Sequence, residues 1–268
     1  ATPRQQRALA EADMIACEDT RRTGKLLEHL GIEREGGTPE LVRYEEHNER
    51  EAADQLVDHL RRGADVTLVS DAGTPGISDP GYWLVRAALG ADIEVTSLPG
   101  SVAAIVGLVA SGLPTTDVQF RGFPPSQSGQ RRSFLERIDS PALTTVLYES
   151  PHRLEALFDD LSEIYGASRR ATVGRELTKA HEEYLRGTVG DILDELRDRE
   201  RIRGECTVVI EPAPEEETDD EVVDAKIREL LDDGMRSRGI KEVVDELYDV
   251  SRSSLYDRIE RIRDELDN

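Results

Sequence analysis

Cysteine, lysine and aromatic residues are scarce in this chain of 268 residues. The two cysteines, Cys17 and Cys206, lie far apart in apolar stretches without the spacing of metal ligands, so we expect two small buried thiols and no metal site. Aromatic residues make up 4% of the chain, and the sequence contains neither an apolar run of membrane-spanning length nor a signal peptide. We therefore expect a soluble, intracellular protein of the cytoplasm.

Acidic residues outnumber basic ones, and lysine is rare among the basic residues. The formal net charge is −22, and only four of the 34 basic residues are lysines. An acidic, lysine-poor surface is typical of a halophilic protein, because concentrated salt screens the self-repulsion. The net field also repels phosphate and so argues against binding nucleic acid by charge alone. Arginine pairs such as Arg21-Arg22 and Arg131-Arg132 leave local contacts possible.

The stretch from Val69 to Gly81 is the most informative part of the chain. A short apolar run at 66–69 predicts a buried strand, and small turn-forming residues follow it. Asp79-Pro80 has the pattern of an N-cap and a first helical residue, so we expect a helix to begin there. Such a loop can present backbone amides to a ligand at the carboxyl end of a strand. An ordinary strand-to-helix turn explains the spacing equally well.

Helix and strand patterns alternate through the first part of the chain. The apolar stretch at 102–110 predicts a helix buried on all sides, between domains or against a partner subunit. The other expected helices run from Thr2 to Ala12, from Thr20 or Thr23 to Gly31, from Asn48 to Gly63 and from Asp79 onward, and the expected strands cover 13–16, 66–69 and 93–98.

The pattern then changes to that of a mixed, largely antiparallel sheet. We expect an acidic linker at 212–220 and three helices beyond it, the last two joined through Val250–Ser253 as in a helix-turn-helix. The predicted fold class is α/β with a helical extension, and the predicted domains are 1–116, 117–212 and 213–268. Strands are expected at 119–123, 144–148, 171–173, 184–188 and 206–210, and helices around 134–138 and from Pro151.

Three further clusters of polar residues follow expected strands. The first is Cys17–Thr23, where helix capping explains only part of the run. The second is Tyr148–Arg153, whose His152 alone would be typical of a surface histidine. The third is Arg175–Lys179. Because the chain otherwise chooses arginine, Lys179 indicates a position where an ammonium group is needed.

Together these motifs resemble the RsmI family, the small-subunit ribosomal RNA cytidine 2′-O-methyltransferases of the tetrapyrrole-methylase fold. The resemblance extends in order to about Ile210, and the C-terminal helices are similar to the family's small tail domain. The motifs that carry it are Ala12–Thr23, Ser70–Pro75, Ser78–Gly81, Leu98–Ser101, Tyr148–Arg153 and Arg175–Lys179.

The resemblance implies two α/β domains with S-adenosylmethionine in the cleft between them, usually in a homodimer. The family's first strand ends in a Gly-Thr-Pro-Ile-Gly-Asn-Leu-type loop that is absent here, so we interpret the sequence as a fragment or as the result of a misplaced start of translation. The residues expected along the cofactor are Asp71, Ala72, Gly73, Thr74, Ile77, Val102, Ala103, Tyr148 and Glu176.

The implied reaction is an in-line attack of a ribose 2′-hydroxyl on the sulfonium methyl, in which positioning supplies much of the rate. A base, or a cation that stabilises the alkoxide, would activate the hydroxyl. We favour Lys179 and Glu149 for catalysis. The wider sets are Glu18, Asp19, Glu149 and Glu176 as bases and Arg21, Arg153 and Lys179 as cations.

The expected partner is small-subunit ribosomal RNA or the assembled subunit, contacted through Arg21, Arg22, Arg131 and Arg132. In high salt, shape, stacking and the 2′-hydroxyl should carry more of the recognition than phosphate charge. Two alternatives remain open. One is a tetrapyrrole methyltransferase of the same fold, which the Glu-Asp-Thr-Arg and Glu-Ser-Pro-His-Arg runs disfavour. The other is a binding module that uses the C-terminal helices, whose acidic charge is unsuited to a DNA duplex.

Overall fold

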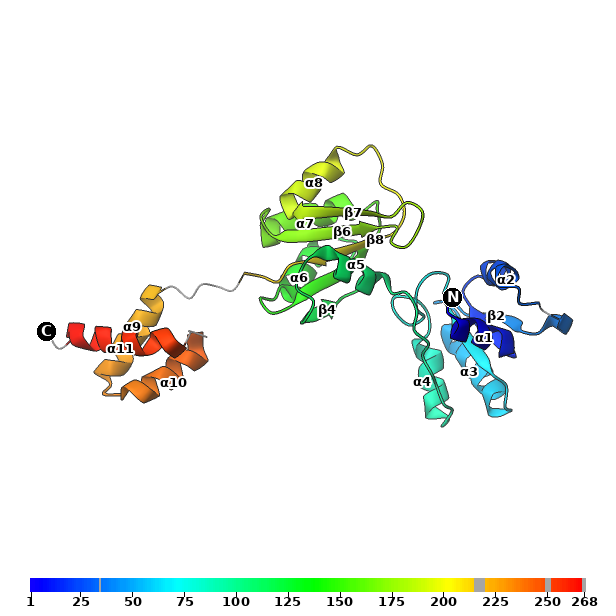
Figure 1. The fold of residues 1–268 in the computed structure, drawn as a ribbon, viewed down its shortest axis with the longest axis horizontal. Helices are drawn as coiled ribbons and strands as arrows, with labels where there is room; N and C mark the ends of the chain where they lie inside the picture. Colours follow the sequence, from blue (N-terminus) through cyan, green and yellow to red (C-terminus); the bar gives the residue numbers. More distant parts are fainter. Residues whose placement is uncertain (34, 215–219, 249–251, 267–268) are drawn as a thin grey trace. The chain divides into compact units, whose positions relative to one another are not determined.

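The computed structural model describes residues 1–33, 35–214, 220–248 and 252–266. Internal contacts divide the chain into two compact units, Ala1–Ala213 and Pro214–Asn268. The first unit contains two β-sheets, and the second is a group of helices (Figure 1). In the part of the chain that the structure describes, no helix is both long and apolar enough to cross a membrane.

A parallel three-stranded sheet of order β2-β1-β3 organises the first part of the chain. Alternate residues of its central strand face opposite sides, as a buried strand requires. Ile15 and Cys17 pack with α1 and α2, while Met14 and Ala16 pack with α3 and α4. These elements are β1 (Met14–Cys17), β2 (Glu40–Arg43), β3 (Val66–Val69), α1 (Pro3–Glu11), α2 (Thr20–His29), α3 (Glu49–Arg61) and α4 (Tyr82–Gly90), with a short 3-10 turn at Glu35–Gly37.

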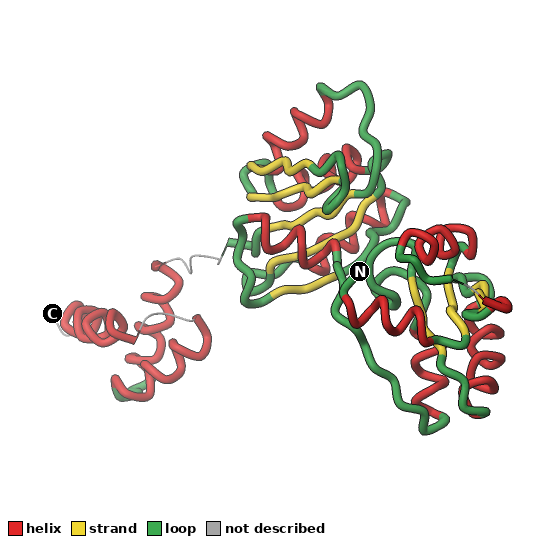
Figure 2. Tube along the Cα trace, turned by 45° about the vertical axis from the view of Figure 1, so that its right-hand side comes forward, coloured by secondary structure: helices red, strands yellow, loops and turns green. Residues whose placement is uncertain are grey.

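A five-stranded sheet of order β4-β5-β8-β6-β7 follows (Figure 2). Only its β4–β5 pair is parallel, which confirms the predicted mixed, largely antiparallel sheet. The helix α5 packs on one face, and α6, α7 and α8 pack on the other. The elements are α5 (Ala103–Ser111), β4 (Val118–Phe120), α6 (Ser128–Ile138), β5 (Thr144–Glu149), α7 (Leu154–Tyr165), β6 (Arg170–Arg175), β7 (Glu183–Thr188), α8 (Val189–Arg197) and β8 (Cys206–Ile210).

Capping residues in the sequence correctly predicted where several helices begin. Thr2 and Gln5 form a reciprocal capping box with Pro3 at the first helical position. Asp19 caps α2, which therefore begins at Thr20 rather than at the alternative Thr23.

The expected helix start at Asp79-Pro80 is wrong. The helix α4 begins at Tyr82, and Gly81 occupies its N-cap position. A capping carboxylate must reach the N–H of the second or third helical residue, and no such bond forms here. Asp79 is therefore a half-buried carboxyl group without a capping function.

The strand expected at 93–98 is absent from the described structure, in which this segment has no regular secondary structure. A strand exists only where a neighbour completes its hydrogen bonds. The strand β3 forms a ladder with β1, and no other described strand pairs with it. Ile93 packs against the core beside α3 and α4, whereas Val95 is exposed.

The helix α5 is buried on one face rather than on all sides. Ala104 and Leu108 pack on the second sheet, whereas Ile105 and Val109 are exposed by 56% and 72%. A Cβ atom on Gly107 would lie 2.8 Å from Cγ2 of Thr207, so α5 approaches β8 closely at this residue.

The second unit contains α9 (Asp220–Asp232), α10 (Ser237–Tyr248) and α11 (Arg252–Leu266), which confirms the three predicted tail helices. Their apolar faces share one core that includes Ile227, Ile240 and Ile259. The expected linker and the expected helix-turn-helix connection fall partly at 215–219 and 249–251, outside the described residues.

Two glycine substitutions test the packing of α5. Gly107→Ala should lower the free energy of unfolding by about 1–3 kcal/mol, because the added methyl group overpacks against Thr207. Gly129→Ala in α6 is the control, since nothing lies within 4 Å of its added Cβ. It should stabilise by roughly 0.5–1 kcal/mol. Thermal and urea unfolding measure both; equal effects would contradict the tight α5–β8 contact.

Candidate functional site

The loops that follow β1 and β3 are joined at the carboxyl edge of the first sheet. Oε1 of Glu18 accepts a hydrogen bond from the Asp71 N–H at 2.9 Å, and Oδ1 of Asp71 accepts one from the Asp19 N–H at 3.3 Å. Arg22 completes the connection with an ion pair to Asp71 at 3.0 Å. The carboxyl edge of a parallel sheet is where α/β proteins bind their ligands.

The loop after β3 also contacts the segment before α5. The Thr74 hydroxyl donates to the carbonyl oxygen of Ser101 at 3.2 Å. Gly73 has φ +99°, and a Cβ atom on it would lie 3.7 Å from the same Ser101 oxygen. Ala72 and Gly73 are exposed, and their N–H groups form no hydrogen bond within the described structure. The loop therefore has two free backbone N–H groups at the point where it contacts the segment before α5.

Tyr148 connects the second sheet to the same region. Its phenolic oxygen accepts a hydrogen bond from the Ala104 N–H at 3.1 Å, near the start of α5, next to the predicted cofactor residues Val102 and Ala103. Burial raises the pKa of Tyr148, and the carboxylates of Asp79 and Glu205 act in the same direction. The structure thus places Tyr148 within electrostatic reach of Asp79 in the loop after β3.

Lys179 is held between two carboxylates. Its Nζ lies 2.9 Å from Oε1 of Glu176 and 2.8 Å from Oε2 of Glu205. The bond to Glu205 is the main cause of the raised pKa of Lys179, and the bond from Lys179 is the main cause of the lowered pKa of Glu176. Lys179 is therefore a permanent cation that joins the end of β6 to the residue before β8.

Glu149 is inaccessible to a substrate. Its exposed fraction is 1%. Oε1 accepts from the Ser150 N–H at 2.7 Å, and Oε2 accepts from Nη2 of Arg153 at 2.8 Å. The same Arg153 nitrogen donates to the carbonyl oxygen of Pro124. This geometry contradicts the expectation that Glu149 is the base and gives Arg153 a structural role in holding β5 and the start of α7.

Among the described residues no arginine or lysine forms an ion pair with Asp79 or Glu18, whereas Asp19 and Asp71 at the same edge are paired with Arg21 and Arg22. Burial, followed by the charge of Glu18, raises the pKa of Asp79 to about 6. Glu205 and Asp71 contribute in the same direction, and the Ser70 hydroxyl opposes them.

Backbone strain is concentrated in the predicted motifs. The described non-glycine residues with positive φ are Ser78, Asp92, Glu176 and Thr178, at 63°, 56°, 50° and 66°. All except Asp92 lie in the loops that carry Asp79 and Lys179. Such conformations persist where the surroundings impose them, and they are frequent at functional sites.

The four arginines predicted to contact RNA fall into two groups. Arg21 and Arg22 have side chains that are 86% and 70% exposed at the carboxyl edge, where they pair with Asp19 and Asp71. Arg131 is only 4% exposed and is bound to Asp160 at 2.7 Å inside the α6–α7 contact, which contradicts its predicted role. Arg132 also faces α7, where it pairs with Glu163.

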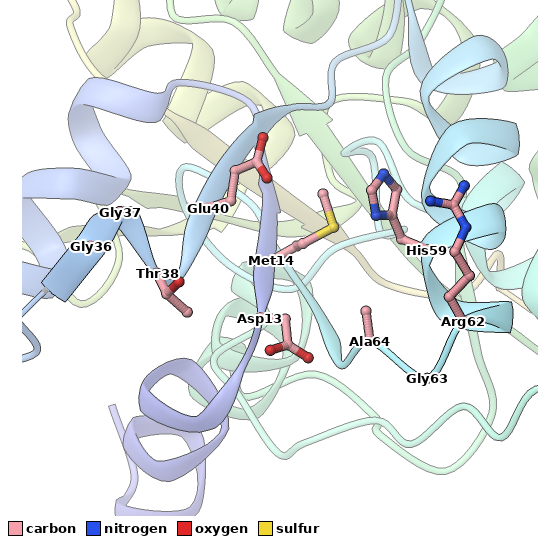
Figure 3. Close-up of a pocket in the computed structure, with 10 residues that line it drawn as sticks. All are labelled: Asp13, Met14, Gly36, Gly37, Thr38, Glu40, His59, Arg62, Gly63 and Ala64. Carbon is pink, nitrogen blue, oxygen red and sulfur yellow. The ribbon is translucent and has the colours of Figure 1, made fainter.

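A hollow of about 660 Å³ is lined by residues other than those of the candidate site. Figure 3 shows Asp13 and Glu40 near the starts of β1 and β2, with His59 and Arg62 at the end of α3. It therefore opens at the amino edge of the first sheet, opposite to the motif loops. Among the described residues, no group of three or more His, Cys, Asp or Glu side chains could hold a metal ion.

Comparison with known proteins relates this arrangement to one family. The model of the Tetrapyrrole (Corrin/Porphyrin) Methylases matches residues 1–193. A ribosomal RNA small subunit methyltransferase I from Micromonospora olivasterospora is 40% identical over 94% of this chain and 79% of the relative. Proteins of the same name from Halalkalibacterium halodurans and Escherichia coli O157:H7 are 46% and 38% identical, over 81% and 95% of this chain and 72% and 88% of those proteins.

The chain belongs to the ribosomal RNA small subunit methyltransferase I family.

Solved structures of other tetrapyrrole methylases share the fold of this family member. The methyltransferase CobJ aligns with a TM-score of 0.57 at 21% identity, over 80% of this chain and 88% of CobJ. A uroporphyrin-III-C-methyltransferase from Thermus thermophilus aligns with a TM-score of 0.53 at 22% identity, over 78% and 86% of the two chains. At these identities the likeness establishes the tetrapyrrole methylase fold.

Sequence reasoning missed two residues of this family member's candidate site. Asp79 was interpreted as a helix cap, because Asp-Pro before an apolar run is typical of one. Glu205 lies in an unremarkable Gly-Glu-Cys run. Its role appears only when β8 is placed beside β6, where the backbone of Glu205 also bonds with Glu176. A clue was available at Gly204, whose absent side chain leaves room for the Glu176 carboxyl group.

Gly73→Ala tests the loop after β3 in this family member. An alanine at φ +99° is strained, so the loop should shift and the affinity for S-adenosylhomocysteine should fall about tenfold. Gly63→Ala is the matched control, because it has φ +91° and lies in the turn after α3. Isothermal titration calorimetry measures both. A normal affinity in Gly73→Ala would exclude this loop from the cofactor site.

Proposed function

We propose that this protein transfers the methyl group of S-adenosylmethionine to the ribose 2′-hydroxyl of a cytidine in small-subunit ribosomal RNA. The observation that carries the proposal is the meeting of the loops after β1 and β3 at the carboxyl edge of the first sheet. The names of its relatives support an RNA substrate, and the family supports S-adenosylmethionine.

The residues at this edge suit such a cofactor. The unused N–H groups of Ala72 and Gly73 can bind its carboxylate or ribose oxygens, and the missing side chain of Gly73 permits close approach. Asp71, Thr74 and Ile77 continue the same loop, while Val102, Ala103, Tyr148 and Glu176 are the proposed contacts from the second sheet's side. When bound, S-adenosylmethionine supplies a methyl group that is already activated for transfer.

Asp79 is the proton acceptor in this proposal. We choose Asp79 because its raised pKa, about 6, makes its carboxylate a better proton acceptor than an ordinary aspartate, while the other nearby carboxylates accept hydrogen bonds from backbone N–H groups or cations. Asp79 neither caps α4 nor pairs with a cation in the described structure. As the 2′-oxygen gains the methyl group, its proton passes to the Asp79 carboxylate, which loses it to solvent after product release.

Lys179 serves this proposal as a positioning residue. Its raised pKa, caused mainly by Glu205, keeps it protonated, so it cannot accept a proton, and Glu176 and Glu205 both pair with its charge. Its bonds hold two loops of the second sheet in the strained conformation seen at Glu176 and Thr178. Glu18 acts similarly, through its bond to the Asp71 N–H.

A homodimer is also part of the proposal. The exposed face of α5, with Ile105 and Val109, is an apolar surface that a second copy of the chain would bury.

Asp79→Asn should reduce the rate of methyl transfer by about 10²–10⁴-fold while leaving S-adenosylhomocysteine affinity unchanged. In the original protein the rate should rise with pH through about 6, because only the ionised carboxylate accepts a proton. The variant should lose this dependence. At a pH above its raised pKa, the ionised Asp79 carboxylate destabilises the folded protein. Asparagine carries no such charge, so at pH 7 the melting temperature of the variant should equal or exceed that of the original protein.

Glu18→Gln distinguishes the role of the Glu18 carboxylate from that of the Asp79 carboxylate. Its amide oxygen can still accept the Asp71 N–H, but the negative charge beside Asp79 is removed. The pKa of Asp79 should fall, so the acid limb of the pH–rate profile should move to lower pH with the maximal rate largely retained. If Glu18→Gln abolishes turnover and Asp79→Asn does not, Glu18 is the base and Asp79 is not.

The reaction itself is tested with purified protein, tritiated S-adenosylmethionine and small-subunit ribosomal RNA, both free and as the assembled subunit. Methylation on the 2′-oxygen is expected to make one phosphodiester bond resistant to alkali, at a cytidine. Label on a base, or on uroporphyrinogen in place of RNA, would overturn the proposal. A DNA duplex serves as the control for binding through the C-terminal helices.

A further inference from the structure

The aromatic residues of this chain are few, and its single tryptophan lies in an organised cluster with two arginines. The Arg50 guanidinium carbon is 4.0 Å from the ring centre of Trp83, and that of Arg86 is 5.4 Å from it. Arg86 also lies over Tyr82, at 5.9 Å, and donates to its hydroxyl at 3.2 Å. The two rings meet edge to face with their centres 5.1 Å apart. We call Arg50, Tyr82, Trp83 and Arg86 the arginine–aromatic cluster.

The cluster lies at the same edge of the first sheet as the candidate site. Arg50 is in the first turn of α3, which follows the carboxyl end of β2, and Tyr82 is the first residue of α4. Gly81, just before it, approaches the loop after β3 so closely that a Cβ atom there would lie 2.9 Å from the Gly76 nitrogen. The start of α4 is thus packed directly on the proposed cofactor loop.

The cluster is exposed, and among the described residues its two arginines form no ion pair. Tyr82 is 59% exposed, and Arg50 and Arg86 are exposed. Within the described residues neither arginine forms an ion pair, whereas Arg21 and Arg22 at the same edge are both paired with aspartates. In a chain with net charge −22, guanidinium groups held by rings remain available to phosphates.

Aromatic rings and guanidinium planes are the groups on which unpaired nucleobases stack. A duplex keeps its bases stacked internally and could use only the arginines. Stacking also persists in concentrated salt, where attraction between phosphate and arginine is screened. The cluster therefore fits a partner with an unpaired base next to phosphates better than it fits a duplex.

We infer that the arginine–aromatic cluster binds a single-stranded segment of the RNA substrate, with Tyr82 stacked on an unpaired base and Arg50 and Arg86 beside its phosphates. The inference rests on the proposed function and adds the surface that receives the RNA next to the cofactor loop. Trp83, half-buried against the core of the first sheet, fixes the orientation of both arginines.

The test compares substitutions on one helix in the full chain. Tyr82→Ala should weaken binding of a fluorescent single-stranded fragment of small-subunit ribosomal RNA about tenfold or more. Tyr82→Phe keeps the ring and should retain most of the affinity. Leu89→Ala is the matched control, because Leu89 is an equally exposed residue of α4, at 57%, that carries no aromatic ring. Fluorescence anisotropy measures the RNA affinity, and calorimetry with S-adenosylhomocysteine should give the original affinity in all variants.

Salt dependence separates the two kinds of contact. The slope of log affinity against log salt concentration is negative. Arg86→Ala should make it shallower by about 0.7, the value for one phosphate contact on a single strand, whereas Tyr82→Ala should leave it unchanged. Equal RNA affinity in Tyr82→Ala and the original protein would overturn the inference. The inference would also be overturned if Tyr82→Ala and Leu89→Ala lost RNA affinity equally and both changed the sedimentation of the protein. That result would assign this face of α4 to contact with a second copy of the chain. If the original protein binds no RNA but binds S-adenosylhomocysteine, the proposed substrate itself is wrong.

Discussion

The carboxylate of Glu18, which accepts the Asp71 N–H, sets the geometry on which the candidate site depends. The strands of the first sheet are only four residues long, so their ladders alone constrain the following loops weakly. A charge-assisted bond to a backbone N–H is stronger and better directed than the exposed ion pair of Arg22 with Asp71. Burial is the main cause of the raised pKa of Asp79, and the Glu18 charge adds to it, so Glu18 both holds the loop and contributes to the protonation of its carboxyl group.

Much of the fold could be predicted from local sequence. The capping residues at Thr2 and Asp19 act within three positions, and their chemistry is visible without a structure. The mixed character of the second sheet was also correct, because the apolar runs and the turns between them are regular. The failure at 93–98 has a different cause, since β structure depends on a neighbouring strand that no local pattern reveals.

The candidate site was predicted less completely, because its decisive partners are distant in sequence. The motifs lie in loops that follow strands, but Lys179 meets Glu205 across 26 positions, and Arg131 meets Asp160 across 29. A sequence cannot show that one arginine is buried and another exposed when the difference lies in a carboxylate on another element. Asp79 was hidden for a related reason: its residue type suits a helix cap, and only the backbone at Gly81 shows that the cap is elsewhere.

The helix α5 follows the first sheet in the chain but contributes its buried face to the core of the second. Ser111 at its end accepts the Thr172 hydroxyl through its carbonyl oxygen, and the Ala110 carbonyl accepts the Arg186 guanidinium. The two sheets are consequently not interchangeable modules. A chimaera that joins the first sheet of one relative to the second sheet of another would keep the buried face of α5 covered only if α5 came with the second sheet.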